Sequence, residues 1–201
     1  VLTPAGQAEW QVYEDLGHAK ARQVFDRAGN RQQALIDAMD LIATVMLQDE
    51  VAIRDADPDD PAALSCLRDY YQMLLDRFTE FTPAMLPLPL PDAPKYRSPD
   101  GAFLVAWSDD LPIGCVSLRP LEPGTGEIKR LWVHPMARGQ GLARRLMRAI
   151  EDRARDMGLT RLQLDTNTGL PEAVALYRRE GWTDIAPYTT PPANLWMAKR
   201  L

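Results

Sequence analysis

The sequence predicts an α/β protein of the α+β type, in which helices flank a central sheet and a helical hairpin precedes it. Two observations carry this prediction. Apolar residues recur at helical spacing in the first fifty residues and again over 61–81, and from Gly101 the pattern changes to alternation typical of strands. The 201 residues, 46% hydrophobic and 25% charged, have the usage of a globular chain and suffice for one or two domains.

Two helices are predicted in the first fifty residues. Thr3 is a suitable cap and Pro4 is tolerated at the first helical position, so a helix is expected from about 4 to 28, where Gly29-Asn30 ends it. A second amphipathic helix is expected over about 35–48. Because two helices cannot bury all their apolar residues, the hairpin is expected to pack on the rest of the chain or on another chain.

From residue 51 the predicted order is β-α-β-β-β-α-β-α-β-β. The clearest helix, 61–81, carries one apolar stripe that we interpret as core packing, and the proline-rich segment 83–94 is expected to be an extended connection. The remaining helices are expected at 140–157 and 171–180. The strands are expected at 51–54, 101–107, 111–119, 126–134, 161–166, 182–187 and 194–200.

Charge and composition exclude several classes of function. Residues 1–95 carry a net charge of -8 and residues 96–201 a net charge of +3, so the first half is unsuited to binding nucleic acid. Cys66 and Cys115 stand separately in apolar settings and are expected in the core, without a disulfide framework. His18 and His134 are isolated from other ligand types, so no metal site is predicted. No apolar run has membrane-spanning length and no signal peptide opens the chain, so a cytoplasmic location is expected.

The stretch from Glu127 to Leu146 carries the chemistry. A predicted strand runs into the turn Arg138-Gly139-Gln140-Gly141, which opens a helix rich in arginine. Backbone amides and the positive end of a helix attract an anion, and glycine lets the backbone approach it closely. The pattern suits a pyrophosphate, but it is neither the nucleotide triphosphatase nor the dinucleotide-binding motif.

This stretch resembles the GNAT (Gcn5-related) N-acetyltransferases. The run Arg138 to Ala143 matches their Arg/Gln-x-x-Gly-x-Gly/Ala signature, preceded by Leu131-Trp132-Val133-x-Pro and followed by Asp165-Thr166-Asn167 and by 175–182 in register. The resemblance implies that 51–201 is a GNAT domain with a mixed, mostly antiparallel sheet. It also implies an acetyl-CoA-dependent enzyme that transfers an acetyl group directly to a primary amine of a small molecule or protein.

The resemblance also implies which residues hold the cofactor. In that family the main chain of one strand pairs with the pantetheine arm, the glycine turn holds the pyrophosphate, and a tyrosine lies near the sulfur. The cofactor-binding residues implied here are Leu131, Trp132, Val133, Arg138, Gly139, Gln140, Gly141, Leu142, Ala143, Arg144, Asn167, Ala173 and Tyr177. Arg145 and Arg148 are alternatives to Arg144, although four clustered arginines are also typical of a solvated helix face.

The chemistry of acetyl transfer assigns the catalytic roles. The site must take a proton from the amine, stabilise an oxyanion and protonate the departing thiolate. Tyr177 is the expected acid, the Val133 amide the oxyanion donor, and Glu127 the base through water, with Glu172 and Asp165 as rivals. Two alternatives stay open: that Tyr177 is only a core tyrosine, and that Glu127 is an exposed carboxylate at the end of a strand.

The first fifty residues resemble the C-terminal dimerisation region of MarR (multiple-antibiotic-resistance) regulators. The resemblance rests on Leu2-Thr3-Pro4-Ala5-Gly6 and on the order hairpin, then Ser65 to Tyr71, then GNAT, as in fusions of a MarR regulator to a GNAT domain. It implies a domain over 1–50, a homodimer through these helices, and a winged-helix reader upstream of Val1. This chain alone is then not expected to bind DNA.

Two questions of function stay open at this stage. The alternative function is an acyl-CoA-binding sensor module of a MarR-type regulator with little turnover. The acceptor is not readable, and the segments expected to choose it are 83–94 and 187–194.

Overall fold

The computed structural model describes residues 3–32, 34–35, 38 and 51–201. The chain divides into two compact units, residues 1–46 and 47–201, and each is described by itself. The assignment of the first unit to a MarR-like domain stays a prediction. None of the helices in the described ranges is both long and apolar enough to cross a membrane.

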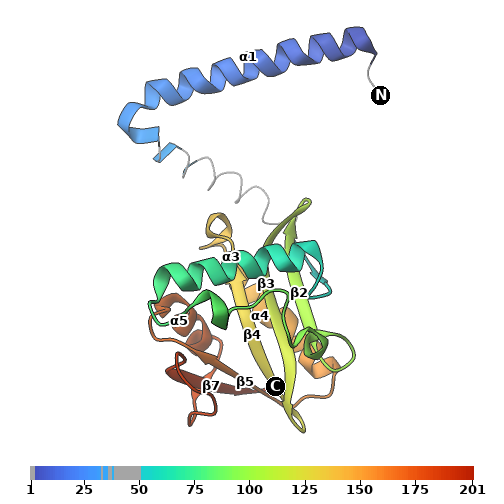
Figure 1. Cartoon of the computed structure of the whole chain (residues 1–201), viewed down its shortest axis with the longest axis vertical. Coiled ribbons are helices and arrows are strands. Elements are labelled where there is room, and N and C mark those ends of the chain that lie inside the picture. The colour runs from blue at the N-terminus through green and yellow to red at the C-terminus, as the bar shows by residue number, and fades with distance from the viewer. Residues whose placement is uncertain (1–2, 33, 36–37, 39–50) are drawn as a thin grey trace. The chain divides into compact units, whose positions relative to one another are not determined.

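The first unit contains helix α1, Pro4–Ala28 (Figure 1). The Thr3 hydroxyl accepts a hydrogen bond from the Gly6 amide at 3.3 Å, and the helix ends where Gly29 adopts a φ of 54°. The predicted helix over 4–28 is therefore confirmed with its cap. The second predicted helix, 35–48, lies almost wholly outside the described residues.

The second unit is built on a seven-stranded sheet in the order β1-β2-β3-β4-β5-β7-β6. Only β4 and β5 pair in parallel, and all the other pairs are antiparallel, so the predicted mixed sheet is confirmed. The strands are β1 (Ala52–Asp55), β2 (Ala102–Ser108), β3 (Leu111–Glu122), β4 (Thr125–Val133), β5 (Arg161–Thr166), β6 (Thr183–Asp184) and β7 (Leu195–Arg200).

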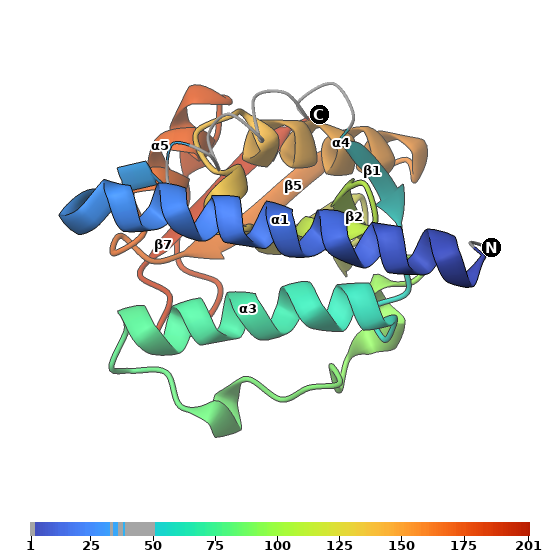
Figure 2. The same ribbon diagram turned by 90° about the horizontal axis from the view of Figure 1, so that it is seen from above.

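Helices cover both faces of the sheet, and Figure 2 shows α3 and α4 on opposite sides of it. Helix α3 (Pro61–Arg77) packs on the face that presents Phe103, Val105 and Cys115. Helices α4 (Leu142–Asp156) and α5 (Pro171–Arg179) pack on the other face, against residues such as Leu104 and Val116. Alternate residues of each strand point to opposite faces, which explains the two cores.

Two predicted elements are shorter than expected. Helix α3 ends at Arg77 because Phe78 turns to an extended backbone and packs against Gly169, where an added Cβ would lie 2.5 Å from the Phe78 ring. Strand β6 has two residues instead of six, since Pro187 cannot donate to a sheet ladder. Hydrophobic periodicity reports apolar residues and not where the backbone stops being helical.

The two cysteines are less separate than their sequence positions suggest. Cys66 on α3 and Cys115 on β3 are both buried and free. Burial raises the pKa of the Cys115 thiol, and a hydrogen bond with Cys66 raises it further, so the two side chains lie side by side in the core. The expectation of two isolated settings was wrong, because pairing between a helix and a strand cannot be read from local sequence.

Candidate active site

Strands β4 and β5 pair at one end and separate at the other. Their parallel pairing covers only Thr125–Glu127 with Arg161–Gln163, although both strands continue beyond it. The register between β3 and β4 gives the reason, since Cys115 pairs with Trp132 but Ser117 pairs with Lys129, which leaves one extra residue on β4. Arg130 in this bulge has a φ of 56°. A bulge bends its strand, and here it turns β4 away from β5.

The end of β4 therefore has a free backbone edge. The His134 amide donates to the Ile113 carbonyl of β3 at 2.9 Å. Because successive amides of a strand point to opposite edges, the Val133 amide points to the open side. The Val133 carbonyl lies on that side too, since Arg138 Nε donates to it at 3.0 Å. An extended ligand with amide groups can pair with such an edge as an added strand does.

The loop before α4 presents unused backbone amides. Gly139 and Gly141 have φ values of 79° and 77°, and an added Cβ at either would meet nothing within 4 Å. No side chain caps α4, and among the described residues the amides from Gly139 to Ala143 have no hydrogen-bond acceptor. Free amides at the positive end of a helix fit a phosphate or pyrophosphate group.

The four clustered arginines have different partners. Arg138 binds the Val133 carbonyl, and Arg145 donates to the Val51 carbonyl at 2.6 Å. Arg144 pairs with Glu180 at 2.6 Å, and Arg148 lies 3.8 Å from the same carboxylate. The side chains of Arg144 and Arg148 are 54% and 59% exposed, so the alternative of a solvated helix face stays open for these two, whereas Arg138 and Arg145 are held by backbone carbonyls.

A cavity of about 870 Å³ joins these features. It has the size of a site for a small molecule or cofactor. Of the sequence-predicted residues, Gln140 and Glu127 do not line it, and the Gln140 side-chain amide donates to the Met136 carbonyl instead. The predicted residues that do line it are Leu131, Trp132, Val133, Arg138, Gly139, Gly141, Leu142, Ala143, Arg144, Asn167, Ala173 and Tyr177.

Comparisons with known proteins agree with this geometry. The model of the acetyltransferase (GNAT) family matches residues 67–182. The chain is 36% identical over 144 residues to a protein named IAA acetyltransferase from Azospirillum brasilense, a match that covers 68% of this chain and 94% of the relative.

Solved structures give the same fold. A putative acyl-CoA N-acyltransferase from Klebsiella pneumoniae is 29% identical, with a TM-score of 0.57 over 75% of this chain and 97% of that one. A putative acetyltransferase from Salmonella typhimurium, solved with acetyl-CoA, is 20% identical, with a TM-score of 0.58 over 75% of this chain and 93% of that one.

The chain belongs to the GNAT family of acetyltransferases. The fold class and the enzyme class that the sequence predicted are therefore confirmed. Acetyl-CoA is the acyl donor of GNAT acetyltransferases, and the free β4 edge and uncapped α4 amides are the features that such a donor requires.

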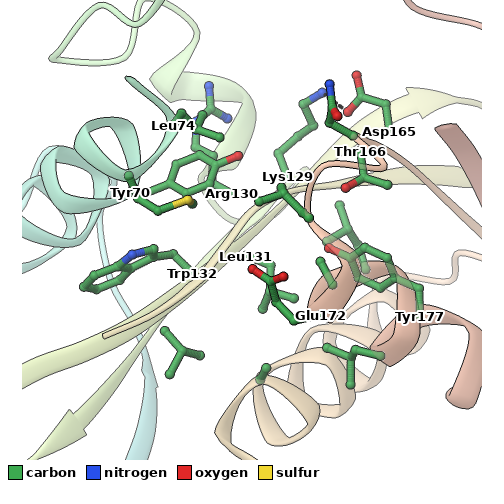
Figure 3. Close-up of a pocket in the computed structure, with 18 of the residues that line it drawn as sticks. Tyr70, Leu74, Lys129, Arg130, Leu131, Trp132, Asp165, Thr166, Glu172 and Tyr177 are labelled. Atoms are coloured by element: carbon green, nitrogen blue, oxygen red, sulfur yellow. Dashed lines mark hydrogen bonds and ion pairs between the residues drawn. The ribbon is translucent and has the colours of Figure 1, made fainter. Parts of the chain in front are cut away.

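Tyr177 has the properties of a proton donor in this GNAT site. Burial raises the pKa of its hydroxyl, and the negative charge of Asp165 raises it further, so the phenol is protonated at neutral pH. Its hydroxyl has no hydrogen bond to a described residue, and Figure 3 shows it pointing into the cavity from α5. Asn167, in contrast, uses its side chain locally, donating to the Pro192 carbonyl and accepting from the Gly169 amide, both at 2.8 Å.

The three candidate bases differ in access. Glu127 is fully buried, so the alternative of an exposed strand-end carboxylate is wrong. Its oxygens accept from Arg119 at 2.6 Å, Tyr188 at 3.1 Å and Lys129 at 3.4 Å. The carboxylate itself does not line the cavity, and of its three partners only Lys129 does.

Asp165 and Glu172 both line the cavity. Asp165 accepts from Lys129 at 2.6 Å and from Thr189 at 2.9 Å. Glu172 forms a bidentate ion pair with Arg77, one of whose hydrogen bonds is 3.0 Å long. Burial raises the pKa of Glu172, but the hydrogen bonds and charge of Arg77, a backbone hydrogen bond and the charge of Arg138 together outweigh it, so the pKa is lowered. Asp165 is thus the carboxylate best placed to meet a ligand in the GNAT cavity.

Sequence reasoning missed one whole wall of the cavity. Tyr70, Leu74 and Phe78 line it from α3 and its end, although the stripe over 61–81 was interpreted as core packing alone. That interpretation was wrong in part, because apolar spacing is the same for a core and for an apolar cavity wall. The consecutive tyrosines Tyr70-Tyr71 were the available signal, since tyrosine brings a polar group to an apolar surface.

Proposed function

We propose that this protein transfers the acetyl group of acetyl-CoA directly to a primary amine. The observation that carries the proposal is the free edge of β4, which opens beside the uncapped amides of α4 and opposite the hydroxyl of Tyr177. One cavity thus brings together a place for an extended amide chain, a place for an anion and a protonated acid.

The donor would be held mainly by backbone groups. The main chain of Leu131, Trp132 and Val133 would pair with the pantetheine arm, and the amides from Gly139 to Ala143 would hold the pyrophosphate. Arg144 is the arginine of the cluster that lines the cavity beside this loop without being tied to backbone. When bound, acetyl-CoA supplies a thioester carbonyl that a neutral amine can attack.

Two groups of the chain serve that attack. The Val133 amide points to the open edge and would donate a hydrogen bond to the carbonyl oxygen as negative charge develops on it. Tyr177 holds a proton at neutral pH and would release it to the departing sulfur. Direct transfer needs no covalent enzyme intermediate, because the amine and the acetyl donor would be held together in one site.

Asp165 replaces Glu127 as our proposed base. It lines the cavity, whereas Glu127 is buried behind it and bound on both oxygens. Lys129 lies 2.6 Å from Asp165 and 3.4 Å from Glu127, so one ammonium group contacts both carboxylates. Glu127 then acts as a positioning residue that fixes Lys129.

The test is an acetylation assay with a panel of primary amines. The amount of free coenzyme thiol released should equal the amount of acetylated amine formed. A tertiary amine is the control and should give neither product. The reported relatives are named as acetyltransferases, which supports turnover over the sensor alternative. A folded protein that binds acetyl-CoA but acetylates no amine would overturn the proposal and favour a sensor.

We also propose that the first unit forms a homodimer contact, in line with its MarR-like sequence. Tyr13, Leu16 and Val24 of α1 are exposed and lie on one side of the helix. Light scattering of the whole chain should give the mass of a dimer, which Leu16→Glu should reduce to that of a monomer. The exposed Gln11→Glu on the same helix is the control, and a monomeric wild type would contradict the proposal.

A further inference from the structure

The cavity has a second part on the α3 side of the sheet, which we call the acceptor chamber. Its apolar wall comes from α3 and the segment after it, and all of these side chains except the exposed Met85 belong to the core on the α3 face. The residues of that wall are Met73, Leu74, Phe78, Phe81, Met85 and Leu86. The uncapped α4 amides and Tyr177 lie on the opposite face, so this wall is free to contact a second ligand.

The apolar wall indicates the body of that ligand. The rings of Phe78 and Phe81 are tilted, with centroids 5.9 Å apart, and Met85 at the chamber is 48% exposed. Aromatic and thioether side chains bind apolar and aromatic groups and gain little from a strongly hydrated one. A ligand that fills this part of the chamber should therefore present an apolar surface.

The charges of the chamber exclude a polycation. Lys129 and Arg130 line it with the carboxylates Asp165 and Glu172, which are already paired with Lys129 at 2.6 Å and with Arg77, respectively. Arg130 adds a positive charge that Asp92 meets at 3.6 Å, and its Nη1 has no hydrogen-bond partner among the described residues. A ligand with several ammonium groups would find both carboxylates already paired and would meet an apolar wall, and both features oppose its binding.

One polar group of the chamber is free to receive an amine. Tyr70 lines the cavity from α3, and its hydroxyl has no hydrogen bond to a described residue. Figure 3 shows this hydroxyl and that of Tyr177 pointing toward the centre from opposite sides. Burial raises the pKa of Tyr70, and the nearby Tyr177 adds to this, so the phenol stays neutral and its oxygen can accept a hydrogen bond from an N–H group.

We propose that the acceptor is a monoamine with an apolar, preferably aromatic, body, and that Tyr70 is a specificity-determining residue that binds its nitrogen. This inference rests on the proposed function, since it assigns the amine of that same reaction. The body lies along the apolar wall, and the nitrogen lies between Tyr70 and Asp165.

The first experiment compares three amines at saturating acetyl-CoA. The value of kcat/KM should be roughly 30-fold higher for 2-phenylethylamine than for ethylamine, because only the former buries a ring. Spermidine should be the poorest of the three. A preference for spermidine or for ethylamine would overturn the inference and leave the proposed function intact. No transfer to any amine by folded protein that binds acetyl-CoA would instead overturn the proposed function.

The second experiment tests Tyr70 with Tyr70→Phe, which removes only the hydroxyl. The KM for 2-phenylethylamine should rise roughly fivefold, the effect of one lost hydrogen bond, with kcat within about twofold and acetyl-CoA affinity unchanged. Tyr96→Phe is the matched control, because that hydroxyl binds Asp92 and lies outside the cavity. An unchanged KM, or an equal loss of acetyl-CoA affinity, would overturn the role of Tyr70.

A third variant tests the charge argument by adding a negative charge to the chamber. Met85→Glu places a carboxylate at the mouth of the chamber and should raise kcat/KM for spermidine roughly tenfold while lowering it for 2-phenylethylamine. Leu111→Glu is the control, since Leu111 is 69% exposed and lies outside the cavity. No change in the ratio of the two amines would count against an acceptor bound at this wall.

Discussion

The two sides of strand β4 are built in different ways. On the α4 side, the groups that face the cavity are mostly backbone amides of the glycine loop and of the strand edge. On the α3 side they are side chains of α3, of the segment after it and of β5. Backbone amides bind any ligand that presents the same hydrogen-bond acceptors, whereas side chains distinguish one ligand from another. This difference indicates that the α4 side is suited to a common acyl donor and the α3 side to a particular acceptor.

The largest expected effect is on the backbone side. Gly141→Glu puts bulk and a negative charge beside the free amides and should lower acetyl-CoA affinity on the order of 1000-fold in calorimetry. Gly158→Glu is the matched control, because Gly158 also has a φ of 77° and open space, at the other end of α4. Equal affinity losses in both variants would show a folding defect and break the comparison.

Tyr177 lies at the junction of the two sides. Tyr177→Phe should lower kcat about 100-fold with acetyl-CoA affinity unchanged, the usual size of an effect from losing a general acid. Because burial raises the pKa of Tyr177, the acid form persists, and kcat should show no alkaline loss from this group up to about pH 10. An alkaline limb near pH 8 that disappears in Tyr177→Phe would contradict the assigned environment.

Variants of Asp165 and Glu127 compare a carboxylate that lines the cavity with one that is buried behind it. Asp165→Asn should also lower kcat about 100-fold, with a smaller loss of stability than Glu127→Gln, because it removes one ion pair and Glu127→Gln removes two. Glu127→Gln should lower the free energy of unfolding by about 3 kcal/mol, because it leaves Arg119 and Lys129 partly buried without their shared partner. Denaturant unfolding and steady-state kinetics on both variants give the comparison, and a larger kcat loss in Glu127→Gln would restore Glu127 as the base.

The smallest effect concerns the ion pair that joins the two sides. Arg77 at the end of α3 and Glu172 at the start of α5 are 35% and 57% exposed, so their coupling should be at most about 1 kcal/mol. The lowered pKa of Glu172 means that this stabilisation is present above its ordinary value of 4.5 and is lost as the pH falls through the folded pKa. A double-mutant cycle with Arg77→Gln and Glu172→Gln at pH 7 and pH 4 measures it. A coupling that grows toward pH 4 would contradict this sign.

Much of the fold was predictable because its signals are local. The order of elements from residue 51 agrees with the prediction, since alternation, helical spacing and the stops at Gly158 and Gly181 each act within a few residues. The glycine loop was predictable for the same reason, because positive φ at Gly139 and Gly141 and the start of α4 lie within one short stretch.

The sequence by itself therefore determined the sheet with its flanking helices, the anion loop and, through family resemblance, Tyr177. Only the tertiary structure decided that the acceptor chamber forms and that Glu127 is buried. Phe78 reaches Gly169 across some ninety residues, and Glu127 is buried where Arg119 of β3 and the distant Tyr188 meet its carboxylate. Register across a sheet and the meeting of a helix with a distant loop depend on packing of the whole domain, which no local pattern encodes.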